Sequence, residues 1–164
     1  MIVRTPEPGD LPHLRRCVAL ARHAVKVGDE PFGSLLMLDG DVLFEDFNHV
    51  SGGDNTRHPE FAIARWAAEN LSADQRRAAV VYTSGEHCPM CAAAHGWVGL
   101  GRIVYAAGAI QLLQWRREWG LDDAPVAPLP ISAVAPGVVV AGPAPELIDE
   151  IRALHARAAG VELD

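Results

Sequence analysis

The chain has 164 residues, 49% of them hydrophobic, so a single domain over residues 1–164 can bury a sizeable core. Its formal net charge of −7 disfavours a general nucleic-acid surface, because phosphate binding relies on clustered Lys and Arg. The sequence lacks a signal-like start and any apolar run of the roughly eighteen residues that a membrane span requires, so we expect a cytoplasmic protein that binds a small molecule.

The first element predicted is a helix. Between residues 11 and 25, leucine, valine and alanine recur at helical spacing, while arginine and lysine occupy another face. Asp10 stands directly before this pattern, where its carboxylate could cap the helix. Gly28 follows the pattern and predicts its end.

A β-hairpin and a loop should follow. The nearly continuous apolar run 32–38 predicts one strand, residues 42–47 predict the next, and Asp39-Gly40 is a two-residue hairpin signal between them. Residues 48–57 are rich in Gly, Ser, Asp and Asn, which is typical of a loop.

The central part alternates helices with strands. We expect a helix over 58–70, a strand over 79–83 that is buried on both faces, a helix over 88–98 and a strand over 103–107. This alternation predicts an α/β sheet covered by helices on both sides, with ligands bound at the carboxyl ends of the strands.

The C-terminal part should complete the domain. We expect a helix over 109–119, a proline-rich connection over 124–130, a last strand over 138–141 and a closing amphipathic helix over 145–158. We find neither an internal repeat nor a low-complexity segment.

Two short motifs predict a metal centre, namely His-Pro-Glu at 58–60 and Cys-Pro-Met-Cys at 88–91. One imidazole and two thiolates form a three-ligand set that zinc accepts while its fourth position stays open for water, which is typical of a catalytic site. Proline is favoured as the first helical residue, so His58 and Cys88 should each cap a helix. The two cysteines, three positions apart, can then project to one side.

Glu60 is the candidate catalytic carboxylate. Inside a helix, residues two apart face different sides, so His58 and Glu60 share a site only if the helix begins between them, as Pro59 predicts. Glu60 could then take a proton from water and deliver it to a leaving group. The simpler interpretation is a solvated carboxylate that complements the helix dipole.

Other interpretations of the metal motifs remain open at this point. A Cys-x-x-Cys pair alone could also be redox-active, as in thioredoxin-like proteins, or arise by chance. A structural zinc site would need a fourth protein ligand, for which His87, His95 and Cys17 are the candidates. Three cysteines do not make a disulfide framework, and we interpret Cys17 as a core residue.

Together the two motifs resemble the H-x-E and P-C-x-x-C signature of the zinc-dependent cytidine deaminase superfamily, with His87 where that signature has proline. The resemblance covers roughly residues 10–158 and implies a three-layer α/β/α sandwich with a mixed sheet of about five strands. It also implies one zinc ion per chain held by His58, Cys88 and Cys91, with Glu60 moving the proton. A homodimer is a further implication, and in it the closing helix or tail could complete a neighbour's pocket.

Substrate contacts also follow from this resemblance. Phe32, Asn48 and Trp97 resemble positions that line the base pocket in the free-base guanine deaminases of the superfamily. Residues 120–123 resemble a segment that brings an acidic base-reading residue to that pocket, here Asp123. Simpler interpretations place Phe32 and Trp97 in the core and give the Asn48 side chain a loop hydrogen bond.

The function expected is hydrolytic deamination of a free nucleobase or related amino-heterocycle such as guanine, cytosine or a triazine, with release of ammonia. A tRNA-specific adenosine deaminase would share the motifs, but the acidic charge and the absence of a Lys- or Arg-rich terminal helix disfavour it. The third possibility is a non-catalytic binding module stabilised by zinc, against which Glu60 counts.

Overall fold

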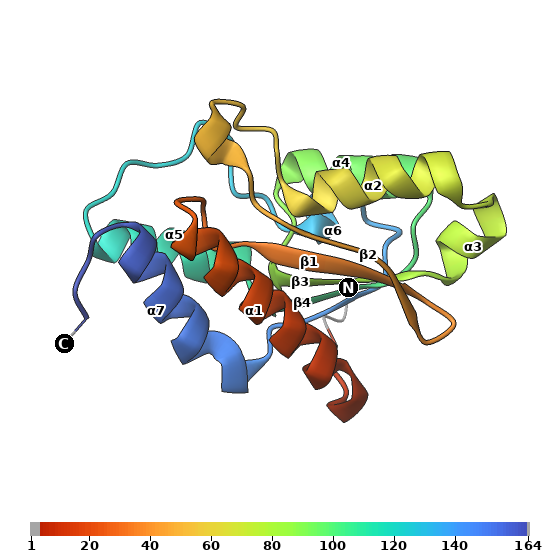
Figure 1. Ribbon diagram of the computed structural model, residues 1–164, viewed down its shortest axis with the longest axis horizontal. Coiled ribbons are helices and arrows are strands. Elements are labelled where there is room, and N and C mark those ends of the chain that lie inside the picture. Colours follow the sequence, from red (N-terminus) through yellow and green to blue (C-terminus); the bar gives the residue numbers. More distant parts are fainter. Residues whose placement is uncertain (1–3, 164) are drawn as a thin grey trace.

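The computed structural model describes residues 4–163, in which five strands form one mixed sheet (Figure 1). The strand order is β2-β1-β3-β4-β5; β1 pairs antiparallel with β2 and β3, whereas β4 pairs parallel with β3 and β5. The strands are β1 (Gly33–Leu38), β2 (Asp41–Phe47), β3 (Val80–Gly85), β4 (Ile103–Ala107) and β5 (Val140–Ala141).

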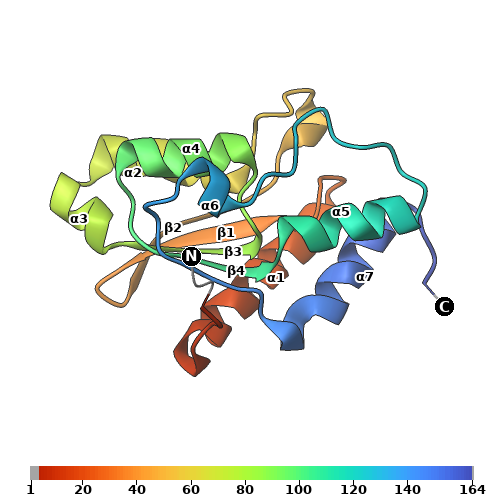
Figure 2. The same ribbon diagram turned by 180° about the vertical axis from the view of Figure 1, so that it is seen from behind.

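Helices cover both faces of this sheet, as Figures 1 and 2 show from opposite sides. α1 (Leu11–Lys26) and α7 (Ile148–Ala158) lie on one face, and α2 (Pro59–Asn70) and α4 (Pro89–Val98) lie on the other. α5 (Ala109–Glu118) contributes Trp115 to the core beneath α1 and α7. The expected three-layer α/β/α sandwich is therefore confirmed. Within residues 4–163, no helix is both long and apolar enough to cross a membrane.

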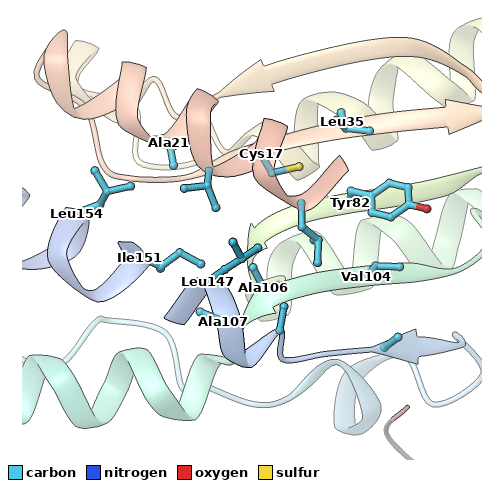
Figure 3. Packing of buried hydrophobic residues seen from close by; sticks show 14 of the residues in the cluster. Cys17, Ala21, Leu35, Tyr82, Val104, Ala106, Ala107, Leu147, Ile151 and Leu154 are labelled. Carbon is cyan, nitrogen blue, oxygen red and sulfur yellow. The ribbon is translucent and has the colours of Figure 1, made fainter. Parts of the chain in front are cut away.

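The core is divided between the two faces because successive strand residues point to opposite sides of a sheet. Leu35 and Tyr82 pack against the layer of α1 and α7, where Figure 3 also shows Cys17, Ile151 and Leu154. The neighbouring residues Leu36 and Val81 pack beneath α2 instead. Cys17 is fully buried, which confirms it as a core residue.

The hairpin between β1 and β2 turns where the sequence predicts it. Asp39 has φ 52° and Gly40 has φ 87°, so both turn residues adopt the left-handed conformation that a type I′ turn requires. This turn sets the register, in which Leu38 lies opposite Asp41. The hairpin thereby places Ser34 in the interior of the sheet, opposite Thr83 of β3.

Three expectations about the elements were wrong or incomplete. The sequence interpretation missed α3 (Ala73–Ala78), which Ser72 and Gln75 cap reciprocally, and the four-residue α6 (Ile131–Val134). The last strand has only two residues, because the chain pairs with β4 only there. The closing helix α7 begins at Ile148, after one short 3₁₀ turn.

Asp10 does not cap α1 with its side chain. Its buried carboxylate instead accepts hydrogen bonds from Tyr82 Oη at 2.9 Å and from the Arg102 guanidinium at 2.5 Å. A buried carboxylate needs a charged partner more than a local backbone donor, because an uncompensated buried charge is strongly destabilising. The interaction therefore ties the start of α1 to the sheet.

Candidate metal centre

The two metal motifs lie at the beginnings of neighbouring helices, as expected. His58 is the N-cap of α2 with φ −87° and ψ 141°, and Cys88 is the N-cap of α4 with φ −66° and ψ 165°. Proline is the first helical residue in both cases. Neither His58 nor Cys88 uses its side chain to cap the backbone, so both side chains are free to face a shared centre.

The three expected ligand atoms come together. His58 Nδ1 lies 3.5 Å from Cys88 Sγ and 3.6 Å from Cys91 Sγ. A tetrahedral zinc ion bound at its usual distances to nitrogen and sulfur would separate these atoms by about 3.6 Å. The donor set and its spacing therefore fit one zinc ion. The described part of the chain adds no fourth His, Cys or carboxylate donor to this group, which argues against a closed structural site.

One of the three metal ligands, Cys88, favours the thiolate form that binds a cation. A hydrogen bond from the Cys91 thiol holds the pKa of Cys88 at about 4, although burial opposes this shift. The same contact raises the pKa of Cys91, since its proton is shared with the neighbouring thiolate. The hydrogen bond to Cys88 also raises the pKa of His58. Cys88 thus lies ready as a thiolate at the positive N-terminal end of α4.

Glu60 lies in the first turn of α2 and is buried, which rules out a solvated carboxylate. Its Oε1 accepts hydrogen bonds from Ser34 Oγ at 2.7 Å and from Thr83 Oγ1 at 2.9 Å. Burial raises the pKa of Glu60, although the two hydroxyl groups partly oppose that shift. The sequence analysis missed Ser34 and Thr83. The available signal was a single hydroxyl side chain, Ser34, in the otherwise apolar β1, and hydroxyl side chains next to the apolar start of β3.

Asn48 and Phe32 lie beside each other in the fold. The backbone N–H of Asn48 donates to the Phe32 carbonyl at 3.0 Å. Asn48 is fully buried, and its Oδ1 accepts from the Val50 backbone N–H at 3.1 Å. Among residues 4–163 its Nδ2 has no hydrogen-bond partner. A buried amide donor without a partner is costly, so this nitrogen is available to a ligand.

The Phe32 ring lies against the strand end that leads to the metal ligands. A Cβ atom placed on Gly85 would come within 2.9 Å of Phe32 Cε1, so a larger residue there would force the ring to shift. The ring also packs edge-on against His155 of α7, with centroids 5.1 Å apart. Phe32 is half-buried and so has surface left for a flat ligand.

Two of the expected substrate contacts are not in an enclosed site of a single chain. The Trp97 side chain is 90% exposed, because six positions beyond Cys91 place it about 120° around the helix from that ligand. Asp123 is exposed and forms an ion pair with Arg117 at 3.3 Å. A substrate contact by either residue stays a prediction. Trp115 is a buried packing residue.

His87, which replaces the proline of the family signature, faces the protein interior. Its buried ring packs edge-on against His95, with centroids 5.4 Å apart, and burial lowers the pKa of His87 well below its usual value. The preceding residue, Glu86, accepts backbone N–H groups of Ala109 at 2.9 Å and Ile131 at 3.0 Å. These contacts hold the turn before Cys88 without a proline.

Comparisons with known proteins agree with this arrangement. Residues 9–107, which include both metal motifs, match the family model of the cytidine and deoxycytidylate deaminase zinc-binding region. Guanine deaminase of Bacillus subtilis is 38% identical over 112 residues, which are 67% of this chain and 69% of that protein. The tRNA-specific adenosine deaminase of Agrobacterium fabrum is 36% identical over 88 residues, which are 53% of this chain and 58% of that protein.

A solved structure supports the same relationship. The X-ray structure of guanine deaminase from Bacillus subtilis superposes on this chain with a TM-score of 0.57 and 35% sequence identity. The superposition covers 69% of this chain and 71% of that structure. Sequence and fold therefore agree over the part of the chain that contains the metal centre.

Proposed function

This chain belongs to the cytidine and deoxycytidylate deaminase zinc-binding family, and from that membership we propose that it hydrolyses the exocyclic C–N bond of a free nucleobase or related amino-heterocycle. The reaction consumes water and releases ammonia. The observation that carries the proposal is the buried carboxylate of Glu60, two residues after His58 of the metal group. A binding module stabilised by zinc would have no use for such a carboxylate.

The metal group assigns one zinc ion to each chain. His58, Cys88 and Cys91 would hold it, since imidazole and thiolate are the ligands that zinc prefers. Zinc bound there supplies Lewis-acid activation, which lowers the pKa of a water molecule to about 7. The three protein ligands leave the open position that a catalytic site requires.

Glu60 moves the protons in this proposal. The other carboxylate oxygen, Oε2, accepts no hydrogen bond from Ser34 or Thr83 and is free to accept a proton from the attacking water. Glu60 then delivers that proton to the ring nitrogen. As the C–N bond breaks and the carbonyl forms, Glu60 carries a second proton from the newly added hydroxyl group to the departing amino group, which leaves as ammonia. A raised pKa suits this double role, because an acid–base catalyst works best when its pKa approaches the operating pH.

Asn48 and Phe32 are proposed to hold the base. The unpartnered Nδ2 of Asn48 would donate a hydrogen bond to a ring nitrogen or carbonyl oxygen of the substrate. The half-buried ring of Phe32 would pack against the flat face of the heterocycle. A free base is favoured over an RNA loop by the net charge of −7, and the guanine deaminase relative makes guanine the first candidate.

Ammonia release from a panel of substrates tests the proposal. The panel holds guanine, cytosine, an amino-triazine, the corresponding nucleosides and a tRNA, each with and without a zinc chelator. We expect release from one or more free bases, with guanine fastest, and loss of release with chelator. Ammonia release from the tRNA alone would instead favour tRNA-specific adenosine deamination. No release from any substrate of the panel would contradict the proposal.

We also propose that the chain forms a homodimer through the outer face of α4. That helix contains no Asp, Glu, Lys or Arg, yet it leaves Trp97 90% exposed. In a chain of net charge −7, an uncharged face is the one on which two copies can approach without repulsion. Sedimentation should give a dimer for the natural chain and a monomer for Trp97→Glu; equal masses would contradict the assignment.

The cytoplasm is the proposed location. The described structure contains three free cysteines, and two of them serve as metal ligands. A reducing compartment keeps such thiols available for zinc. Fractionation of producing cells, with the protein detected by antibody, tests this assignment.

A further inference from the structure

A pair of buried hydroxyl groups lies directly behind Glu60. Ser34 of β1 and Thr83 of β3 are cross-strand partners, both fully buried, with their side-chain oxygens 2.9 Å apart. Both hydroxyls also contact one and the same carboxylate oxygen, Oε1 of Glu60. Since they come from the sheet and Glu60 comes from α2, the contact fixes the helix start against the sheet.

We propose that Ser34 and Thr83 are positioning residues for the deamination reaction, which hold Oε1 as a hydrogen-bond acceptor so that Oε2 is the oxygen that moves the proton. This inference rests on the proposed function, in which Glu60 is the proton carrier. Neither residue needs to touch the substrate, because each acts through the carboxylate.

The count of protons supports this division between the two oxygens. Each hydroxyl has one proton to donate, and an oxygen that already accepts hydrogen bonds is the less favourable place for an additional proton. Thr83 Oγ1 also lies 2.9 Å from the Gly85 carbonyl, so its proton has a second acceptor. The Ser34 hydroxyl likewise has a second acceptor, Thr83 Oγ1, at 2.9 Å. Each hydroxyl therefore has Oε1 and one other acceptor within reach, and the carboxylate is the charged one of the two, which favours donation to Oε1.

The two hydroxyl groups are expected to fix the orientation of the Glu60 carboxylate. A carboxylate held by two fixed donors cannot rotate away from the reacting atoms, and such preorganisation affects turnover more than substrate binding. The strands that supply the donors are central in the sheet, which makes them rigid supports.

Steady-state kinetics of matched variants test the inference. Ser34→Ala and Thr83→Val each remove one hydroxyl, and losing a hydrogen bond to a charged group should lower kcat by about 10- to 100-fold. KM should change by no more than about twofold, because binding of the base is untouched. Zinc content should stay at one ion per chain. Thr83→Ser keeps the hydroxyl and should retain most of the activity that Thr83→Val loses.

Ser84→Ala is the matched control. Ser84 is a buried serine next to Thr83 in β3. Its Oγ accepts a hydrogen bond from the Gly33 backbone N–H at 3.1 Å and does not contact Glu60. Its kcat should stay near that of the natural chain. The inference is overturned if Ser34→Ala leaves kcat unchanged, if it changes KM or zinc content instead, or if Ser84→Ala lowers kcat equally.

A crystal structure separates this inference from the proposed function. In zinc-loaded Ser34→Ala, the Glu60 carboxylate should take more than one orientation, whereas a single unchanged orientation would overturn the inference. Melting temperatures establish that the variants are folded. If Ser34→Ala does not fold, comparing kcat of Thr83→Ser with kcat of Thr83→Val still decides whether the hydroxyl group is needed. Absence of ammonia release by the natural chain from every base would defeat the proposed function, while the orientation of Glu60 would still decide this inference.

Discussion

Asp10 and Arg102, ninety-two positions apart in the sequence, form a largely buried ion pair that joins the start of α1 to the beginning of β4. Tyr82 of β3 donates a hydrogen bond to the same carboxylate. Burial, with a smaller effect of this hydrogen bond, raises the pKa of Tyr82 to about 12. One carboxylate thereby connects a helix and two adjacent strands. Removing it leaves a guanidinium and a hydroxyl without their partner.

We therefore expect Asp10→Ala to lower the free energy of unfolding by about 3 to 5 kcal/mol, the range for breaking a buried pair. Asp74→Ala removes an exposed carboxylate that pairs with Arg77, so it should lower that free energy by no more than about 1 kcal/mol. Urea denaturation of both variants measures the difference. Similar losses in the two would show that the Asp10 pair contributes little.

The metal ligands can be tested by zinc content. His58→Ala, Cys88→Ser and Cys91→Ser should each bind well below one zinc ion per chain, since each removes one of only three protein ligands. Cys17→Ala removes a buried cysteine of the opposite layer and should keep its zinc. Elemental analysis of protein purified without chelator gives the answer, and full occupancy in a ligand variant would remove that residue from the set.

Glu60→Gln should separate zinc binding from turnover. The amide keeps the shape of the side chain but can no longer carry protons between water and base, so kcat should fall by a factor on the order of 10² to 10⁴. Zinc content should remain that of the natural chain, because Glu60 is not part of the ligand group. Ammonia release and metal analysis on the same sample provide both values. Retained turnover would assign the proton transfer to another group.

Asn48→Asp is the most selective change at the base contact. The new carboxylate keeps the oxygen that accepts from the Val50 backbone N–H, but it loses the unpartnered Nδ2 donor. Losing that hydrogen bond should lower kcat/KM by at least about tenfold with zinc content unchanged. Asn70→Asp changes an exposed amide at the end of α2 and serves as the control. Equal kinetics in both variants would exclude Asn48 from the substrate site.

Stability should depend on pH through His155. Burial, with a smaller effect of the Arg116 charge, lowers the pKa of His155 to about 3 in the folded chain. Between about pH 6.5 and 3 the unfolded chain binds a proton there that the folded chain does not, so stability is lost as the pH falls. The loss from this residue should reach about 2 kcal/mol at pH 5.

His155→Phe removes that loss while keeping an aromatic ring between Phe32 and Trp115. The unfolding free energy of the variant minus that of the natural chain should therefore increase by about 2 kcal/mol when the pH is lowered from 7 to 5. This difference should stay constant between pH 7 and 8. Denaturation at these pH values measures the difference. A difference that does not vary with pH would show that His155 is already protonated in the folded chain or reaches water.

The features that the sequence by itself determined are those set by neighbouring residues. Pro59 and Pro89 begin helices directly after a metal ligand, because proline fixes the first helical residue. Asp39-Gly40 sets the hairpin because few residue pairs accept a left-handed turn. The Ser72 and Gln75 cap of α3 was a local signal of the same kind, and the sequence interpretation overlooked it.

The tertiary structure decided what depends on residues far apart in the chain. The Ser34 and Thr83 hydroxyls meet Glu60 only because β1 and β3 pair in one register and α2 packs across them. The Asp10 carboxylate pairs with Arg102 instead of capping α1, because a buried carboxylate is stabilised more by a charged partner than by a backbone N–H. Strand register and helix rotation thus determine which side chains face the site, and neither is encoded in a short stretch of sequence.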